Sequence, residues 1–271
     1  MEIKLDFTKS AQENAQIYFE KSKKAKRKAE GAERAIKDLE AKLAQITLKK
    51  EKTRQLKRVE KKEWYEKFHW FFTSNGMLVI GGNSAEQNEL LNNKYFLDND
   101  LFFHADIFGA GLIVLKEGVT ASHEAREEAA QFAACFSKAW PDGLTAVNVY
   151  CLKRDQVSKS SQKGYLGKGS FLLSGEREWF KGTSLELCIF AKDKEGTAEG
   201  DVTGPVANTI KVQVAPLLAC KRLGIPRYVL LKPGKTKKSD AAKYVAKELG
   251  CAVDDVMQLL PAGDFSTENR D

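Results

Sequence analysis

The sequence predicts an α+β protein: a basic antiparallel coiled-coil arm, then a mixed α/β domain with a C-terminal α/β extension. Three observations predict this class. A long heptad pattern opens the chain, an excess of positive charge coincides with it, and short strand-like and helix-like stretches follow without regular alternation. We therefore expect three parts, residues 1–63, 64–182 and 183–271.

The arm is expected because small and apolar residues recur at alternating spacings of four and three, the seam of a coiled coil. The helix is expected from about residue 10 to residue 46, with Thr8 or Ser10 as its cap. Beyond Ile46 the register is lost, but "TLKKEKTRQLKRVEKKEW" has no Pro or Gly, so it is expected to fold back as a second, shorter helix. The seam consists of Ala11, Ala15, Tyr18, Ser22, Ala25, Ala29, Ala32, Ile36, Leu39, Leu43 and Ile46.

Positive charge is concentrated in the same segment. Residues 1–63 contain 19 Lys and Arg against 11 Asp and Glu, whereas the whole chain has a net charge of only +7. The clusters "KSKKAKRK" and "LKRVEKK" favour a face that follows RNA phosphates, and a solvated helix surface is the alternative. The residues expected to contact RNA here are Lys23, Lys24, Lys26, Arg27 and Lys28.

Several classes of protein are disfavoured. No apolar stretch approaches the roughly 20 residues that cross a bilayer, and "MEIKLDFTKS" lacks the apolar region of a signal peptide. We therefore expect a cytoplasmic protein without membrane partners. The five cysteines are widely spaced and only three histidines accompany them, so no zinc site, disulfide framework or cofactor is expected.

The remainder of the chain contains recognisable strands and helices. "GMLVIGG" predicts a buried strand, "DLFFHADIFGAGLIVLKEG" predicts two strands joined at the glycines, and "ASHEAREEAAQFAACFSKAW" predicts a helix capped by Ser122. Their irregular order favours α+β over a doubly wound sheet. The aromatic segment "WYEKFHWFF" is expected to close a core against the base of the arm, and base stacking is the alternative.

His104 and Asp106 are two residues apart, so on a strand they would share a face, and Gly109 would let the chain bend after them. Catalysis would need a nucleophile or a metal partner, but the other two histidines lie in unrelated stretches. We therefore expect no enzyme. Two interpretations stay open: Asp106 anchors the turn while His104 hydrogen-bonds within the domain, or the pair forms a polar binding edge.

A basic loop, "KRDQVSKSSQKGYLGKG", is a further candidate for phosphate contact, because its lysines lie among Ser and Gly whose backbone N–H groups can meet an anion. A solvated hairpin loop is the alternative. The basic residues of this loop are Lys153, Arg154, Lys159, Lys163 and Lys168.

The C-terminal stretch "KPGKTKKSDAAKYVAKELG" predicts a turn at Pro233 and Gly234, then a helix capped by Ser239. Its apolar face is expected to pack on the sheet of the preceding domain. Lysines would gather just before the helix start and hold an anionic group such as RNA phosphate; a solvated turn is the alternative. These lysines are Lys232, Lys235, Lys237 and Lys238.

Several stretches together resemble one family. "WYEKFHWFFTSNGMLVIGGNSAEQNELLNNKYF", "DNDLFFHADIFGAG", "EEAAQFAACFSKAW" and "DQVSKSSQKGYLGKGSF" occur in the order of the NFACT-R domain. The arm, with "SAQENAQIYFEKSKKAKRKAEGA", is similar to the coiled-coil middle region of the NFACT family, and the tail is similar to extensions of archaeal-type members. The chain is thus identified as an RqcH/NEMF-like NFACT protein over nearly its whole length.

The resemblance implies an RNA- and ribosome-binding role in ribosome-associated quality control. Family members bind the large ribosomal subunit, its RNA and an obstructed nascent peptidyl-tRNA, and many support C-terminal tailing, which is not carried over here. The NFACT-N and helix-hairpin-helix regions of complete members are not found in this sequence. We therefore expect a fragment or a shortened member, with a separate NFACT-N-containing protein as a further expected partner. A protein-protein adaptor docking through its coiled coil, and a nucleic-acid binder unrelated to ribosomes, are the alternatives.

The sequence departs from the family pattern at positions expected near RNA. His69 stands where Arg is common in the "RWF" motif, Asn83 lies in "GGNS" where "GGRD" is usual, and Phe108 replaces the second histidine of "HADLHGA". Two positive charges and one histidine are lost. These departures lower the positive charge expected on the RNA-contacting surface of the domain.

Overall fold

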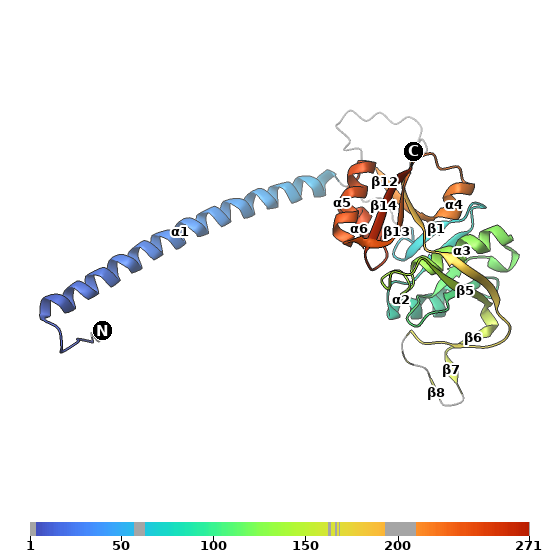
Figure 1. The fold of residues 1–271 in the computed structure, drawn as a ribbon, viewed down its shortest axis with the longest axis horizontal. Helices are drawn as coiled ribbons and strands as arrows, with labels where there is room; N and C mark the ends of the chain where they lie inside the picture. The colour runs from blue at the N-terminus through green and yellow to red at the C-terminus, as the bar shows by residue number, and fades with distance from the viewer. Residues whose placement is uncertain are drawn as a thin grey trace. The chain divides into compact units, whose positions relative to one another are not determined.

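The computed structural model describes residues 4–56, 63–161, 164–165, 167, 169–192 and 210–270. The chain divides into two units, Met1–Lys61 and Lys62–Asp271. The first unit is a long helix with a short N-terminal segment. The second contains the sheets and the other helices (Figure 1).

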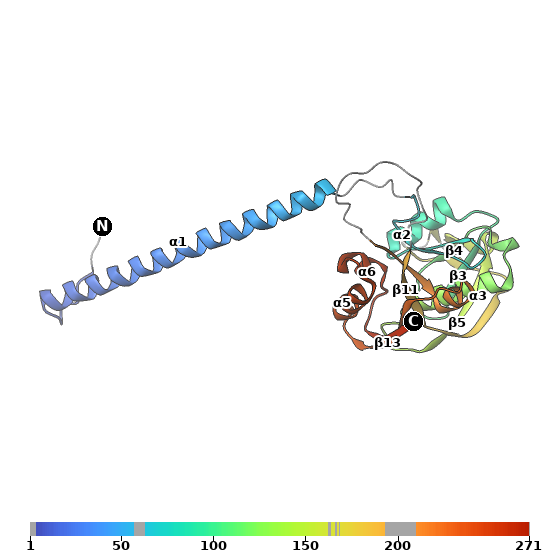
Figure 2. The same cartoon turned by 90° about the horizontal axis from the view of Figure 1, so that it is seen from above.

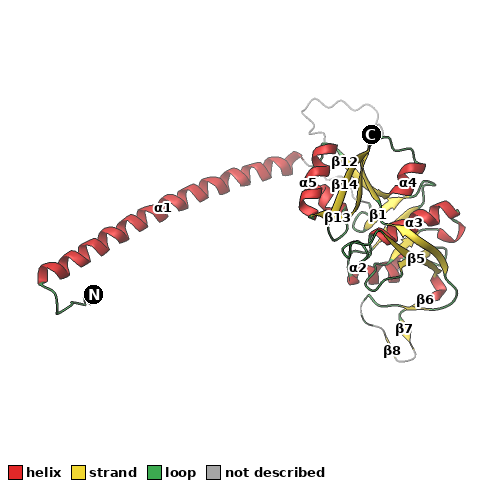
Figure 3. Cartoon of the chain, viewed as in Figure 1, coloured by secondary structure: helices red, strands yellow, loops and turns green. Residues whose placement is uncertain are grey.

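Helix α1 (Ala11–Leu56) is the main element of the first unit, and its 46 residues span roughly 70 Å at 1.5 Å per residue. It is drawn as one uninterrupted helix in Figure 3. The turn expected after Ile46 is therefore wrong, and α1 has no antiparallel partner helix within the described residues. The physical reason is composition: the stretch to Leu56 lacks helix breakers and is rich in Lys, Leu, Gln and Arg, which continue a helix readily. Coiled-coil pairing stays a prediction.

The start of α1 is held by side-chain hydrogen bonds. Ser10 and Glu13 cap each other's backbone: the Ser10 N–H donates to Glu13 Oε2 at 2.8 Å, and the Glu13 N–H donates to Ser10 Oγ at 3.3 Å. Of the two expected caps, Ser10 is confirmed, whereas the Thr8 hydroxyl donates to Asp6. The buried Asn14 side chain accepts from the Asp6 N–H at 2.9 Å. None of the described helices combines the length and apolar character that a membrane crossing requires.

A six-stranded sheet with the order β1-β2-β4-β3-β5-β10 forms the first half of the second unit, and all its pairings are antiparallel. Its strands confirm the α+β class. They include the two strands that the sequence predicted around "HADIFGAG". The strands are β1 (His69–Phe72), β2 (Leu78–Gly81), β3 (Leu101–Ala105), β4 (Ile113–Leu115), β5 (Ala146–Lys153) and β10 (Glu178–Ser184).

The register assigns the residues of this sheet to two faces, because alternate residues of a strand point to opposite sides. One cross-strand row runs through Ile80, Val114 and Phe102, and these residues belong to a core cluster with Leu91 and Phe96. The short elements near the sheet are α2 (Ala85–Leu90), the π-helix η1 (Leu91–Tyr95), and the 3-10 turns η2 (Gly118–Thr120) and η3 (Arg154–Gln156).

Helix α3 (His123–Cys135) packs against the opposite face of the six-stranded sheet. It begins as predicted, with the Ser122 hydroxyl accepting from the Ala125 N–H at 3.3 Å. The same helix also contacts β12 (Lys211–Pro216) and α4 (Leu217–Arg222), which belong to the second half of the unit. One continuous core cluster therefore extends on both sides of α3.

A second antiparallel sheet, ordered β12-β11-β13-β14, completes the unit. Figure 1 and Figure 2 show α5 and α6 side by side against it. Two short two-stranded pairs, β6–β9 and β7–β8, lie in the loop region after β5. The remaining elements are β6 (Val157–Ser158), β7 (Ser160–Ser161), β8 (Gly164–Tyr165), β9 (Leu172–Leu173), β11 (Leu187–Lys192), β13 (Tyr228–Thr236), β14 (Phe265–Arg270), α5 (Lys238–Leu249) and α6 (Val253–Leu259).

The C-terminal predictions need three corrections. Strand β13 continues through Pro233 and Gly234 with a bulge, so these residues form no turn; a Cβ at Gly234 would lie 2.3 Å from the Ser266 nitrogen, and this close approach of β14 explains the glycine. Helix α5 begins at Lys238, with Lys237 and not Ser239 at the cap position. Its buried apolar face packs on the second sheet and not on the six-stranded one.

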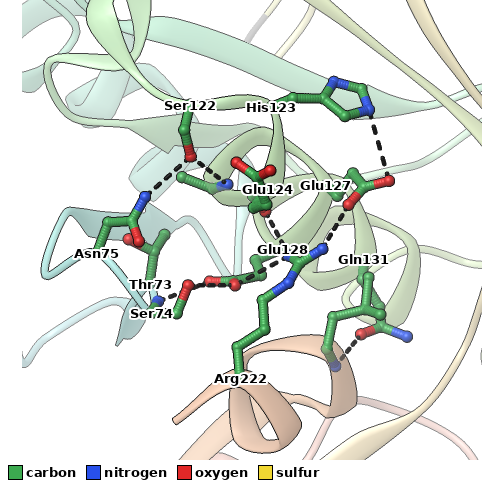
Figure 4. A network of polar contacts seen from close by, with 12 residues as sticks. Thr73, Ser74, Asn75, Ser122, His123, Glu124, Glu127, Glu128, Gln131 and Arg222 are labelled. Carbon is green, nitrogen blue, oxygen red and sulfur yellow. Dashed lines mark hydrogen bonds and ion pairs between the residues drawn. The ribbon is translucent and has the colours of Figure 1, made fainter.

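A buried carboxylate links three segments of the second unit (Figure 4). Glu128 of α3 accepts hydrogen bonds from the Ser74 N–H at 2.8 Å and from the Ser74 hydroxyl at 2.6 Å. Arg222 of α4 donates to Glu128 at 3.0 Å and to Glu127 at 2.6 Å. The segment between β1 and β2, α3 and α4 are thus joined by hydrogen bonds to a charged group, which are stronger than neutral ones.

The aromatic segment is only partly core. Phe68 and Phe71 are buried as expected, but Trp64 is 42% exposed and Phe72 is 39% exposed. The alternation along β1 explains the difference between Phe71 and Phe72, because neighbouring strand residues face opposite sides. The prediction that the whole segment is core was therefore too broad.

Candidate nucleic-acid interface

The basic residues of α1 are accessible. Lys23, Lys24, Lys26, Arg27 and Lys28 are all exposed. At 3.6 residues per turn they spread over roughly 200° of the helix circumference. They therefore form a broad band of positive charge, as a surface that follows phosphates without reading bases requires.

The loop after β5 uses its cations differently. Lys159 donates to the carbonyl oxygens of Gly167 at 2.8 Å and Ser170 at 3.1 Å. Arg154 donates to the Val157 carbonyl at 2.9 Å, and its guanidinium lies 5.1 Å from the centroid of the Phe96 ring. These two residues hold the loop together.

Of the other cations in this loop, Lys153 is exposed. Lys163 and Lys168 lie outside the described residues. Of the five cations that were expected to meet phosphate in this loop, Lys153 is the one that is exposed among the described residues.

The C-terminal lysines also divide into two groups. Lys235 and Lys237 are exposed. Lys238 donates to the Leu260 carbonyl at 2.8 Å, and its burial lowers the pKa of its amine. Lys232 forms a 2.9 Å ion pair with Glu186. The expected group of four free lysines before α5 is therefore reduced to Lys235 and Lys237.

His104 lies on β3 directly opposite Tyr150 of β5. The His104 Nδ1 atom and the Tyr150 hydroxyl are 3.3 Å apart, within hydrogen-bonding distance. Desolvation lowers the pKa of His104, although backbone groups of Ala105 and Ala110 and the charge of Asp106 oppose the shift. A histidine with a lowered pKa is neutral near pH 7.

The same cross-strand row continues to the sheet edge. Trp179 of β10 lies opposite Tyr150, with ring centroids 5.2 Å apart and planes at 63°. The Arg177 guanidinium lies 4.4 Å from the centroid of the Tyr150 ring and 5.9 Å from that of Trp179. We call His104, Asp106, Tyr150, Arg177 and Trp179 the edge cluster.

The loop that follows β3 begins at the edge cluster. Asp106 is exposed, and its N–H donates to the Asn148 carbonyl at 2.7 Å. Gly109 has φ +81°, a left-handed conformation that favours glycine. Phe108, beside it, is 92% exposed. His104 thus lies within hydrogen-bonding distance of Tyr150 inside the domain, as the first interpretation expected, and Asp106 is exposed to solvent. The polar binding edge stays a prediction.

The sequence reasoning missed Tyr150, Arg177 and Trp179. One signal was present, because Arg177 and Trp179 are two residues apart in "EREWF" and therefore share a face on a strand. The pairing of Tyr150 with both His104 and Trp179 required the register of three strands, which no local pattern contains.

Comparison with known proteins places this geometry in a family. Residues 67–175 match the model of the NFACT protein RNA binding domain, a range that contains His104, Asp106 and Tyr150. The archaeal Rqc2 homolog aRqcH of Methanocaldococcus jannaschii is 36% identical over 216 residues, which are 77% of this chain and 30% of that protein.

Two animal proteins are similar over a shorter stretch. The ribosome quality control complex subunit NEMF homolog of Drosophila melanogaster is 34% identical, over 68% of this chain and 19% of that protein. Human ribosome quality control complex subunit NEMF is 33% identical, over 64% of this chain and 17% of that protein. The chain thus spans less than a third of the length of these relatives. With its RNA-binding-domain match and these relatives, the chain belongs to the NFACT family.

Proposed function

We propose that this chain is an RNA- and ribosome-binding component of ribosome-associated quality control. It engages the large ribosomal subunit, through its RNA, when that subunit holds an obstructed nascent peptidyl-tRNA in the cytoplasm. The observation that carries the proposal is the match of residues 67–175 to the NFACT protein RNA binding domain, together with relatives named as ribosome quality control factors. A separate NFACT-N-containing protein is a further proposed partner.

The chemistry of the described surface supports phosphate binding by α1. Five exposed cations lie within six residues, Lys23 to Lys28, on a helix without a sheet packed against it in its own unit. Lysine and arginine side chains that neutralise phosphates release counterions, which supplies sequence-independent affinity for RNA.

We propose binding and not catalysis for the polar residues around His104. The histidine is half-buried, it contacts the Tyr150 hydroxyl, and desolvation lowers its pKa. These contacts favour a fixed, neutral polar group beside aromatic rings. Such a group suits recognition, whereas general acid–base work needs a nucleophile or a reacting proton within reach.

Co-sedimentation with purified ribosomal subunits tests the proposal. The chain should sediment with large subunits and much less with small subunits, and its affinity should fall steeply as salt increases. Large subunits that carry peptidyl-tRNA should bind more tightly than empty ones. Equal binding to both subunits would contradict a ribosome-specific role and favour a general nucleic-acid binder.

A protein-protein adaptor is the second candidate, and α1 supplies the observation that favours it. Ile36 is 55% exposed and Leu39 is 60% exposed, both at positions of the heptad seam. Such residues could pack against a partner helix. Because apolar docking depends little on salt, weak salt dependence of ribosome binding would favour the adaptor.

A further inference from the structure

We propose that the edge cluster binds an unpaired RNA base, with Trp179 as the stacking surface. This inference rests on the proposed function, because it names which part of an RNA the second unit recognises. The candidate differs from the lysine band of α1 in its chemistry, since its centre consists of aromatic rings on strands β5 and β10.

Trp179 is available for stacking. It is 41% exposed and lies on β10, an edge strand of the six-stranded sheet. Tyr150, its cross-strand neighbour, is 4% exposed and supports the indole ring from the sheet interior. An exposed ring on a rigid support loses little conformational entropy when a base stacks on it.

Arg177 adds a second planar group beside the indole. Its guanidinium lies against the Tyr150 ring at 4.4 Å, and it takes part in none of the ion pairs found among the described residues. The adjacent Glu178 pairs instead with Arg126, at 3.1 Å. Arg177 therefore keeps donors for a phosphate or a base edge, and its planar face suits stacking on a base.

The polar members of the cluster face the same side of the sheet. His104 lies in the same cross-strand row as Tyr150 and Trp179, and the exposed Asp106 follows it by two residues. A carboxylate accepts hydrogen bonds from an exocyclic amine of a base or from a ribose 2′-hydroxyl. Since Asp106 and Arg177 carry opposite charges, the cluster is not a general attractor of phosphate.

The chemistry selects unpaired over paired RNA. An A-form duplex keeps its base faces stacked internally and offers mainly phosphates and 2′-hydroxyls, so an exposed indole gains little from it. A single-stranded loop or end can place a base against Trp179. The same rings could accommodate a peptide side chain, but a peptide gives Arg177 no systematic anionic partner.

Trp64 provides a matched control, because it is 42% exposed and Trp179 is 41% exposed. One ring face of Trp64 is already covered by Tyr95, stacked at 4.6 Å and 8°. The contact of Trp179 with Tyr150 is edge-like, with the ring planes at 63°, and no aromatic ring among the described residues stacks face to face on the Trp179 indole. Only Trp179 should therefore contribute to base stacking.

The experiment measures binding of the full chain to a single-stranded RNA of about ten nucleotides and to the same strand paired with its complement. Trp179→Ala should weaken single-strand binding about fivefold or more, the equivalent of one base stacked on an indole, and leave duplex binding and the salt slope unchanged. Trp179→Phe should retain most of the affinity. Trp64→Ala should bind as the unmodified chain does.

Three outcomes would overturn the inference. Trp179→Ala could match Trp64→Ala, it could weaken duplex and single-strand binding equally, or Trp179→Phe could be as weak as Trp179→Ala although its thermal melting is unchanged. In each of these cases RNA binding itself persists, so the proposed function stands. If the unmodified chain binds neither RNA, both proposals fail.

Discussion

The two units of this chain use their charged residues in opposite ways. On α1, the five cations from Lys23 to Lys28 are all exposed. In the second unit, Lys159, Arg154 and Lys238 donate to backbone carbonyls, and Arg222 pairs with two glutamates. The lysine run of α1 stays exposed in a unit that has no sheet of its own. In the second unit some cations instead make contacts that stabilise the fold, whereas Lys153, Lys235 and Lys237 stay exposed.

Removal of the α1 charge should give the largest effect and tests the first half of this comparison. Replacing Lys23, Lys24, Lys26, Arg27 and Lys28 with Gln should weaken binding to ribosomal RNA by about a hundredfold or more. It should also flatten its salt dependence by about 0.7 to 0.9 log units for each phosphate that α1 no longer neutralises. The melting temperature of the second unit should not change. If the salt dependence measured in a filter-binding titration is unaltered, these α1 residues do not contact RNA phosphates.

Replacing Glu128 tests the second part of this comparison, the structural role of charged residues in the second unit. Glu128→Gln should lower the free energy of unfolding by about 2–4 kcal/mol, because a buried carboxylate that accepts from Ser74 and Arg222 is removed. Glu127→Gln is the matched control, since Glu127 pairs with the same arginine but is partly exposed, and it should cost less than about 1 kcal/mol. Urea unfolding measures both; equal costs would mean that burial of Glu128 does not matter.

The stability of the second unit should depend on pH through His69. Burial, with a smaller contribution from the Lys238 charge, lowers the pKa of His69 from 6.5 to about 4. Between these values the unfolded chain binds the extra proton, so stability is full above pH 6.5 and falls as the pH drops towards 4, by about 2–3 kcal/mol. His69→Phe, which keeps a ring against Phe136, should remove this component. Identical pH profiles for both proteins would refute the assignment.

Gly109 should be sensitive to side-chain branching. At φ +81°, Gly109→Val places a β-branched residue in the left-handed region, which costs about 1–3 kcal/mol of stability. Gly109→Asn should cost less than about 1 kcal/mol, because Asn tolerates this conformation. Chemical denaturation ranks the two variants, and a valine variant as stable as the asparagine variant would mean that the loop relaxes.

The smallest effects should come from the lysines near α5. Lys235→Ser with Lys237→Ser should change the free energy of unfolding by less than about 0.5 kcal/mol, because both side chains are exposed. Lys238→Ser should cost about 1 kcal/mol, since it removes the hydrogen bond to the Leu260 carbonyl. If Lys235 and Lys237 contact RNA, replacing both lowers the affinity for RNA without changing the free energy of unfolding. A change in the free energy of unfolding without a change in RNA affinity would mean that the two lysines have only a structural role.

Local signals predicted much of the fold. The helix after Ser122 and the two strands around Gly109 are present, because capping, alternation and a glycine turn are properties of neighbouring residues. The turns at Ile46 and Pro233 were wrong. At Ile46, the loss of the heptad register was interpreted as the end of the helix. At Gly234, the glycine was interpreted as part of a turn, but the structure requires it because strand β14 approaches closely there.

The candidate site was less predictable. The exposed cations of α1 were found from composition alone, and their exposure is confirmed. The roles of Lys159 and Lys238 were not foreseeable, because their acceptors at Gly167 and Leu260 depend on the tertiary fold. The edge cluster was half found for a similar reason: His104 and Asp106 share a local pattern, whereas Trp179 joins them only through strand register.

The position of α3 has a consequence for how this protein can be divided. Gln131 donates to the Ser184 hydroxyl at 2.9 Å and accepts from the Leu218 N–H at 2.9 Å, so one side chain is bonded to both halves of the unit. The family match ends at residue 175, before β10 and the second sheet. A recombinant fragment cut there would leave one side of α3 without its apolar covering. The range matched by the family model is thus shorter than the segment whose side chains cover α3 on both sides.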